Sequence, residues 1–193
     1  MSGLGKDPAR TFIAVFPPAA VVADLAAAVA RVRRPGDGVS WTRPGNLHYT
    51  LRFLGDLSSG RVEAATRAAA AAVVGVAPFT LTLGGTGAFP DLRRPRVLWI
   101  GAAEGGETLA LLARSLSVAL EREGFPREDK PFVSHLTLGR VRDGGEGDPA
   151  VRLAAAEFPP AAFEVRELVV VKSTLSPGGS IYEPVARATL SSG

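Results

Sequence analysis

Hydrophobic and polar positions alternate along the chain with two different periods. Short β-branched, aromatic or alternating runs predict strands, and apolar residues three and four positions apart predict helices. The predicted strands are residues 11–16, 48–54, 79–83, 97–101, 132–141, 164–174 and 180–190. The predicted helices are residues 19–33, 61–76, 107–123 and 149–157. Clusters of glycine, proline, aspartate and serine separate these elements and predict turns, of which residues 84–87 form one.

The same order of elements occurs twice. Each half runs strand, helix, a strand that begins with His-x-Thr-Leu, helix, strand, and 35 positions separate Ile13 from His48 and Ile100 from His135. A repeat with only two copies predicts a pair of lobes related by a pseudo-twofold axis rather than a solenoid. We therefore expect a bilobal α+β fold, with a mainly antiparallel sheet and helices in each lobe and an active-site groove between them. The order of the strands stays open.

Length and composition favour one folded domain. The chain has 193 residues, of which 46% are hydrophobic and 21% are charged, as in ordinary globular proteins. We expect residues 1–10 to form a flexible arm, residues 11–190 a single bilobal domain and residues 191–193 a tail. The formal net charge of +3 is compatible with an anionic partner and equally with none.

Several classes of protein are excluded or disfavoured by what the sequence lacks. It has no cysteines, which excludes disulfides, thiol nucleophiles and thiolate metal sites. The longest apolar runs, residues 19–32 and 68–79, are too short to cross a bilayer, and residues 1–10 contain no apolar core of a signal peptide. We therefore expect a cytoplasmic protein without membrane contact. No apolar stripe is left over for a partner chain, so we expect a monomer.

Both histidines of the chain open the same four-residue motif. His48 begins His-Tyr-Thr-Leu and His135 begins His-Leu-Thr-Leu. Alternate side chains of a strand share a face, so each histidine shares a face with the threonine two positions later, Thr50 or Thr137. The other residues of each motif then point into the core. If the lobes meet along these strands, two imidazoles and two hydroxyls face one groove.

Two imidazoles on one face suit paired acid and base catalysis, because imidazole titrates near neutral pH. One neutral ring takes a proton from water, and the other, protonated, gives a proton to a leaving oxygen, as phosphodiester cleavage requires. Threonine hydroxyls can donate hydrogen bonds to phosphate oxygens. Alternation places Arg52 on the face of His48 as a possible substrate contact. Arg140, the second possible contact, is five residues after His135 and therefore points to the opposite face of the strand unless the strand contains a bulge.

Other interpretations of these residues are weighed against the catalytic one. A single His-x-Thr-Leu is most often an ordinary strand, but two of them in register with a repeat favour a function. A metal site is disfavoured because Asp56, Glu128 and Asp129 lie at no tight ligand spacing from a histidine, so we expect no metal and no cofactor. The remaining candidates are aromatic residues that either stack on bases or pack in the core, namely Trp41, Phe53, Phe89 and Phe132. The basic residues of 93–96 either contact phosphate or belong to a solvated loop.

The two motifs and their surroundings resemble a known family. The chain is similar to the 2H phosphoesterases, named for two His-x-Thr/Ser motifs, and within them to the RNA 2′,3′-cyclic phosphodiesterases, also called 2′-5′ RNA ligases. The resemblance covers nearly the whole chain and is carried by residues 10–16, 41–55, 87–90, 94–101, 132–141 and 176–183. One departure is Ser134, where members of the family often have proline before the second histidine.

The resemblance implies hydrolysis of a terminal 2′,3′-cyclic phosphate of RNA to a 2′-phosphate without a metal. It makes His48 the proton donor to the leaving 3′ oxygen and His135 the proton acceptor that activates water. It makes Thr50 and Thr137 the phosphate-binding residues. The possible substrate contacts are Arg52, Arg140, Phe53 and Phe89. The residues alone do not decide which imidazole is the acid, because the two motifs are nearly equivalent.

Three alternatives stay open. The chain could join RNA ends as a 2′-5′ RNA ligase by the reverse chemistry, act on a small cyclic nucleotide or an ADP-ribose derivative, or bind RNA ends or nucleotides without catalysis. A pure binding module needs phosphate donors but not two groups that titrate near neutral pH, so the paired motifs favour an enzyme.

Overall fold

The computed structural model describes residues 9–142, 148–177 and 179–192. The strands are β1 (Ala9–Val15), β2 (Val39–Trp41), β3 (Tyr49–Leu57), β4 (Phe79–Phe89), β5 (Val97–Glu104), β6 (Leu136–Val141), β7 (Ala162–Val165), β8 (Glu167–Ser176) and β9 (Gly179–Thr189). The helices are α1 (Ala19–Val32), α2 (Ser59–Ala72), α3 (Gly106–Arg122) and α4 (Pro149–Ala154), with a 3-10 turn over Pro44–Asn46. Every predicted helix and strand overlaps an observed one, whereas the short strand β2 was not predicted.

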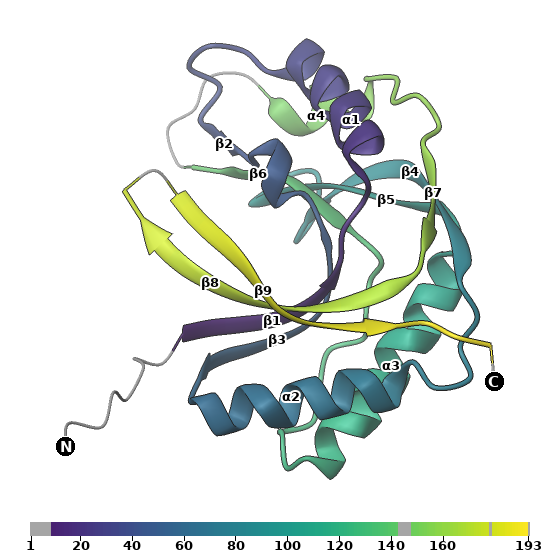
Figure 1. Ribbon diagram of the computed structural model, residues 1–193. Coiled ribbons are helices and arrows are strands. Elements are labelled where there is room, and N and C mark those ends of the chain that lie inside the picture. The colour runs from purple at the N-terminus through teal and green to yellow at the C-terminus, as the bar shows by residue number, and fades with distance from the viewer. Residues whose placement is uncertain (1–8, 143–147, 178, 193) are drawn as a thin grey trace.

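The strands form one curved antiparallel sheet in the order β7-β4-β5-β6-β3-β1-β8-β9, with β2 paired to β6. At its centre β6 meets β3, where Tyr49 is the partner of Leu136. This pairing divides the sheet into a first lobe of β3, β1, β8 and β9 and a second lobe of β6, β5, β4 and β7 with β2. Figure 1 shows how the sheet curves from one lobe to the other. The predicted bilobal α+β fold with antiparallel sheets is confirmed.

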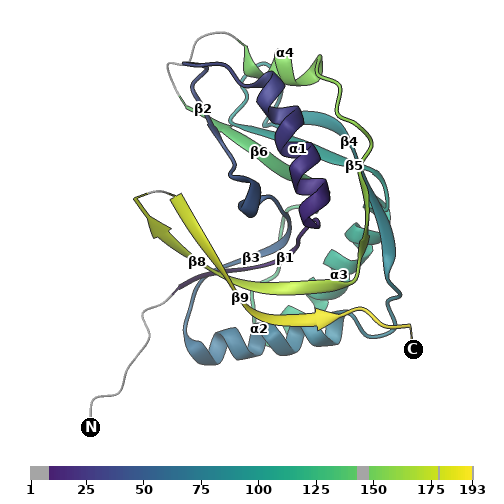
Figure 2. The same cartoon turned by 45° about the horizontal axis from the view of Figure 1, so that its top comes forward.

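Two helices cover each lobe on the same face of the sheet. Helices α2 and α3 pack together beneath the first lobe, and α1 and α4 lie together on the second (Figures 1 and 2). Helix α3 shows why these helices pack on the sheet, because its four leucines at three- and four-residue spacing form one buried apolar stripe. These residues are Leu109, Leu112, Leu116 and Leu120. Burial of this stripe against the sheet is the main driving force for placing the helix.

The predicted repeat has the right order of elements but the wrong alignment of its first strands. Val15 pairs with Tyr49 beside the first motif. Ile100 pairs with Leu136 beside the second motif. The counterpart of Ile100 is therefore Val15, and not the Ile13 that equal spacing suggested. Equal spacing was misleading because the connections between the paired strands differ in length between the two halves.

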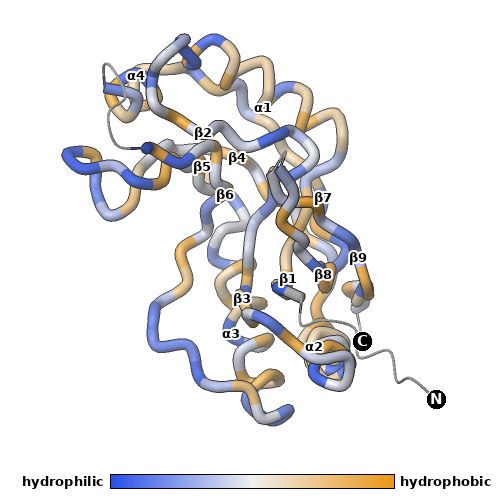
Figure 3. The backbone as a smooth tube through the Cα atoms, turned by 90° about the vertical axis from the view of Figure 1, so that its left-hand side faces the viewer, coloured by the Kyte–Doolittle hydropathy of each residue, from blue (hydrophilic) through white to orange (hydrophobic). Residues whose placement is uncertain are grey.

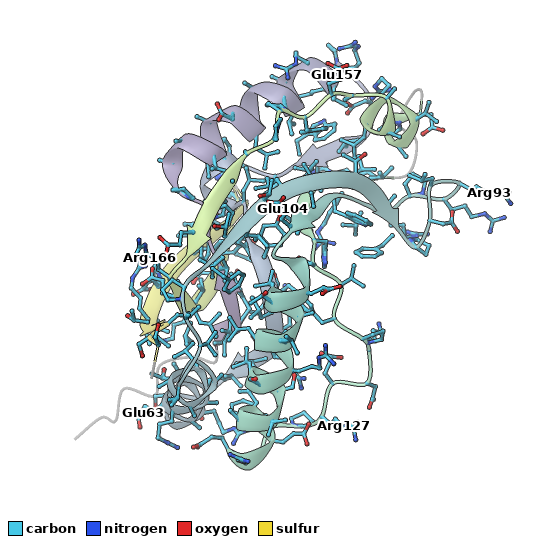
Figure 4. All side chains as sticks on the ribbon, turned by 90° about the vertical axis from the view of Figure 1, so that its right-hand side faces the viewer. Glu63, Arg93, Glu104, Arg127, Glu157 and Arg166 are labelled. Carbon is cyan, nitrogen blue, oxygen red and sulfur yellow. The ribbon has the colours of Figure 1, made fainter. Side chains whose placement is uncertain are left out.

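The predicted single strand over residues 164–174 is wrong. It consists of two strands, because β7 ends at Val165 and pairs with β4, whereas β8 begins at Glu167 and pairs with β1. The chain crosses from the second lobe to the first at Arg166, which Figure 4 labels. Each half of the sequence therefore contributes strands to both lobes, and β8, not β7, is the counterpart of β4.

Other predictions fail only at element boundaries. Residues 84–87 belong to β4 and are not a turn. Gly87 is required there because a Cβ would come within 2.3 Å of the ring of Trp99. Residues 132–135 precede β6 instead of belonging to it, and His48 likewise precedes β3. Strand β1 already includes Arg10 of the predicted arm, whose residues 1–8 lie outside the described residues.

At the other end of the chain, Ser191 of the predicted tail forms a bridge with Val74. Among the helices that the structure describes, none is long and apolar enough to span a bilayer.

Candidate active site

The central pairing of Tyr49 with Leu136 brings the two motifs together, because each of these residues follows the histidine of its motif. Both side chains are fully buried in the core. Their neighbours on either side therefore point to the opposite face of the sheet. In this antiparallel register each histidine lies across from the threonine of the other motif. We call this surface the histidine face, and it carries His48, Thr50, His135 and Thr137.

Each motif contains a β-bulge at its leucine. In β3 the register against β1 shifts so that Leu51 has no partner of its own. In β6 the register against β5 shifts in the same way at Leu138. A bulge inserts one residue into a strand, so the alternation of side chains reverses beyond it. The pseudo-twofold axis thus repeats the bulge together with the motif.

The bulge in β3 overturns the predicted position of Arg52. Arg52 is the partner of Ile13, whose side chain is buried in the core, so Arg52 points away from the histidine face. Its side chain is only 6% exposed and donates a hydrogen bond to the main-chain oxygen of Pro126. Its Nε lies 3.7 Å from a carboxylate oxygen of Glu128. Arg52 therefore anchors the segment that leads to the second motif, and it does not reach a ligand on the histidine face.

The same bulges return Phe53 and Arg140 to the histidine face. Phe53 is the partner of Phe12 and is 65% exposed. Arg140 is the partner of Val97, two residues before Trp99, which is itself the partner of Thr137. The residue five positions after each histidine thus lies beside the motif, as the sequence had allowed for Arg140 if its strand bulged.

Three aromatic rings pack against His48. The rings of Phe12 and Phe16 stack on it at centroid distances of 4.8 and 5.4 Å, and Tyr182 meets it edge-on at 5.4 Å. These three residues were not predicted as part of the site. They come from β1, from the residue just after β1 and from β9, and only the pairing of strands brings them to His48.

His135 has a more open aromatic surrounding. Phe89 meets its ring edge-on at 4.9 Å, and Trp99 lies 6.4 Å away. The rings of Phe89 and Trp99 also contact each other at 5.3 Å. The predicted candidate Phe89 therefore lies at the site, whereas Trp99 is a site residue that no motif indicated.

Both imidazoles are oriented in the same way. Nδ1 of His48 is 2.7 Å from the main-chain oxygen of Asn46, and Nδ1 of His135 is 2.8 Å from that of Val133. A carbonyl oxygen can only accept, so Nδ1 carries the hydrogen in each ring and Nε2 is left to take or give a proton. Asn46 is itself held by a 2.9 Å hydrogen bond from its amide to the main-chain oxygen of Ser180 in β9.

Burial lowers the pKa of both histidines. For His48 this desolvation is opposed by the hydrogen bond to Asn46 and assisted by the charge of His135. For His135 the desolvation is opposed by the hydrogen bond to Val133 and assisted by the charge of Arg140. Because a charge on His135 lowers the pKa of His48, protonating one ring makes it harder to protonate the other. The two imidazoles are therefore coupled, and the pair takes up a second proton less readily than the first.

The two threonines of the motifs complete the histidine face. Thr50 and Thr137 are half-buried, and within the described part of the chain neither hydroxyl makes a hydrogen bond. They can therefore donate to a ligand between the imidazoles.

Arg140 supplies positive charge to this face. Burial raises the pKa of Tyr182, and the charge of Arg140 opposes part of this rise. Arg140 is thus a cation whose charge acts on His135 and on Tyr182.

Two of the aromatic candidates are core residues. Trp41 lies opposite Gly139 on the face away from the histidines, and its indole donates a 3.2 Å hydrogen bond to Asp37. Phe132 packs against the core.

Ser134 has a buried hydroxyl without a hydrogen-bond partner among the described residues. In the same part of the chain, no three His, Asp or Glu side chains gather closely enough to hold a metal ion.

Fold and site together place two imidazoles with the same orientation on one face, at the junction of two related lobes. A family model described as the 2′-5′ RNA ligase superfamily matches residues 17–176. A protein named RNA 2′,3′-cyclic phosphodiesterase from Archaeoglobus fulgidus is 40% identical over 149 residues, which is 76% of this chain and 81% of that protein. The chain belongs to the 2′-5′ RNA ligase superfamily, and its resemblance to the 2H phosphoesterases is confirmed.

Solved structures support the same conclusion. E. coli LigT complexed with 3′-AMP superposes with a TM-score of 0.75 at 30% identity, over 95% of this chain and 99% of that one. The protein TT0787 of Thermus thermophilus superposes with a TM-score of 0.76 at 31% identity, over 94% and 97% of the two chains. The match over nearly the full length includes both lobes and therefore the junction on which the site lies.

Proposed function

We propose that this chain is an RNA 2′,3′-cyclic phosphodiesterase that hydrolyses a terminal cyclic phosphate to a 2′-phosphate without a metal ion. The observation that carries the proposal is the pair of imidazoles on one face, each with Nδ1 bound to a carbonyl oxygen, which leaves Nε2 to take or give a proton. The name shared by relatives such as that from Archaeoglobus fulgidus supports the choice of substrate. The similar LigT structure is a complex with 3′-AMP, which supports a nucleotide ligand.

The proposed reaction is a displacement at phosphorus. Nε2 of His135 takes a proton from water as the water oxygen bonds to phosphorus. The bond from phosphorus to the 3′ oxygen breaks, and Nε2 of His48 gives its proton to that oxygen. Thr50 and Thr137 donate to the non-bridging oxygens, where charge accumulates in the transition state. The products are a 2′-phosphate and a 3′-hydroxyl.

Arg140, Phe53 and Phe89 are the substrate contacts that we retain from the sequence. Arg140 adds positive charge beside the phosphate, since its charge reaches both His135 and Tyr182. Phe53 presents an exposed ring 5.9 Å from that of Phe12, where a base can stack. Arg52 is not retained, because it points to the other face.

The first test is an assay of the purified chain after treatment with EDTA. The substrate is an RNA oligomer that ends in a 2′,3′-cyclic phosphate, and the product is compared with 2′-phosphate and 3′-phosphate standards by mass and chromatography. We expect conversion to the 2′-phosphate with addition of one water and no requirement for metal. A 3′-phosphate product would contradict the assigned leaving oxygen. Binding without turnover would instead support a non-catalytic binding module.

The second prediction concerns pH. The active form has a neutral His135 and a protonated His48, so kcat/KM falls in acid as His135 gains a proton and falls in base as His48 loses one. Desolvation lowers the pKa of both rings from the usual value of 6.5. We therefore expect a bell-shaped profile of kcat/KM whose maximum lies below pH 6.5. A profile with one limb, or a maximum well above neutrality, would contradict the pairing of the two imidazoles.

A further inference from the structure

Positive charge continues beyond the phosphate site along the second lobe. Arg140 lies on the histidine face at the end of β6. Arg142 follows it and donates a 3.1 Å hydrogen bond to the hydroxyl of Ser40, which is the partner of Arg140 and therefore on the same face. Among the described residues, neither arginine makes an ion pair. The hydrolysis of a single phosphate does not need this extension.

The loop between β4 and β5 adds a third cation at the same end of the lobe. Figure 4 shows Arg93 far out on this loop, and Figure 3 shows that the loop is mostly hydrophilic. The first residue of β5, Val97, is the partner of Arg140, so the loop lies beside the end of β6. Asp91 accepts hydrogen bonds from the main-chain nitrogens of Arg93 and Arg94, at 2.8 and 3.0 Å. We call Arg93, Arg140 and Arg142 the basic strip.

An open pocket of about 590 Å³ lies between this loop and the histidine face. It is lined by Gly87, Ala88 and Trp99 of the two strands and by Asp91, Leu92 and Arg93 of the loop. Leu92 in this lining is 48% exposed. The pocket shares Trp99 with the environment of His135, so it is directly next to the phosphate site. An apolar, aromatic pocket of this size beside cations is typical of sites that hold a nucleobase.

We propose that the basic strip and this pocket hold the RNA strand next to its terminal cyclic phosphate, with one base in the pocket and backbone phosphates along the arginines. The proposal rests on the proposed function and deepens it, because it makes an RNA strand, and not a single nucleotide, the substrate that the surface fits. Arginines bind phosphate oxygens without regard to base, so the surface adds affinity but no sequence preference.

Arg96 provides a matched control within the same loop. The register that pairs Val97 with Arg140 places Arg96 across from Val141, and the main-chain nitrogen of Val141 bonds to the oxygen of Arg96 at 3.0 Å. Arg96 therefore points to the face away from the histidines. It has the same charge and is also exposed, so Arg96→Gln changes the net charge without changing the strip.

The experiment compares kcat/KM for a cyclic mononucleotide with kcat/KM for an RNA oligomer that ends in the same cyclic phosphate. Arg93→Gln, Arg142→Gln, the double variant and Arg96→Gln are each measured from 50 to 200 mM salt. We expect the double variant to lower the ratio of kcat/KM on the oligomer to kcat/KM on the mononucleotide by about tenfold. On the oligomer, each lost phosphate contact should also reduce the slope of log kcat/KM against log salt by about 0.7. Arg96→Gln should leave both the ratio and the slope as in the parent.

Each outcome has one meaning for the proposal. Equal losses on both substrates, an unchanged ratio in the double variant, or a loss of the same size in Arg96→Gln would overturn the basic strip as the strand-binding surface. In those cases hydrolysis of the mononucleotide would still support the two-histidine reaction. Absence of turnover on both substrates by the parent chain would instead overturn the proposed function.

Discussion

Replacing either histidine with alanine is expected to lower kcat/KM for a terminal cyclic phosphate by about 10²- to 10⁴-fold, the usual contribution of a positioned acid or base. His48→Ala removes the proton for the leaving 3′ oxygen, and His135→Ala removes the group that activates water. The measurement is the initial rate of 2′-phosphate formation at the pH optimum of the parent. A variant that turned over at the parent rate would exclude that imidazole from the reaction.

The two variants can be separated by the leaving group. A phosphodiester with a weakly basic phenolate as leaving group needs no proton donor, so His48→Ala should recover most of its loss on that substrate. His135→Ala should stay slow on both substrates, because water must still lose its proton. Recovery by His135→Ala in place of His48→Ala would reverse the assignment of acid and base, which the near-equivalence of the motifs leaves open from sequence.

Both variants are expected to fold, which thermal unfolding will check. Within the described residues, each imidazole bonds to one main-chain oxygen and lies on the histidine face. A second pair of variants, His48→Gln and His135→Gln, keeps more of the side-chain volume beside rings such as Phe12 and Phe89. If the alanine variants lose stability, the glutamine variants preserve the test of catalysis.

The placement of the four motif residues on one face could be predicted from the sequence because their pattern is local. Alternation within His-x-Thr-Leu is enough to put histidine and threonine on one face, and the repeat is enough to suggest that two such strands meet. The buried side chains of Tyr49 and Leu136 confirm which face is which. The helices were predictable for the same reason, since the leucine stripe of α3 depends only on its own spacing.

The position of Arg52 could not be predicted, because nothing in the sequence distinguishes a bulge from a regular strand. Leu51 looks like any inward residue of an alternating run, yet it is the extra residue of β3. One inserted residue reverses the positions that directly follow it and exchanges Arg52 for Phe53 on the histidine face. The same insertion at Leu138 is what brings Arg140 to the site.

The aromatic surroundings of the histidines depend on pairings between distant segments. Tyr182 reaches His48 only because β9 lies next to β8 in the first lobe, and Phe89 reaches His135 only because β4 lies next to β5 in the second. The crossing of the chain between lobes at Arg166 is equally non-local, since the residues on both sides of it form strands. A pattern read along one chain contains no information on which strands become neighbours.

Loss of either threonine hydroxyl is expected to be the second-largest effect. Thr50→Val and Thr137→Val keep the branched shape and remove one donor to a phosphate oxygen. Removing a donor of this kind typically lowers kcat by about 10²- to 10³-fold, because the donor stabilises charge that exists mainly in the transition state. KM should change much less than kcat for the same reason. Steady-state kinetics on the RNA oligomer measures both quantities.

Two further substitutions make this prediction specific to the hydroxyl and to its place. Thr50→Ser and Thr137→Ser retain the donor, so each should recover most of the lost kcat. Thr80→Val makes the same chemical change at an exposed position in β4, where Thr80 is the partner of Glu164 and away from both motifs. It should leave kcat as in the parent. An equal loss in the serine and valine variants would mean that the threonines act by packing alone. The phosphate would then need other hydrogen-bond donors, such as Arg140, whose charge acts on His135.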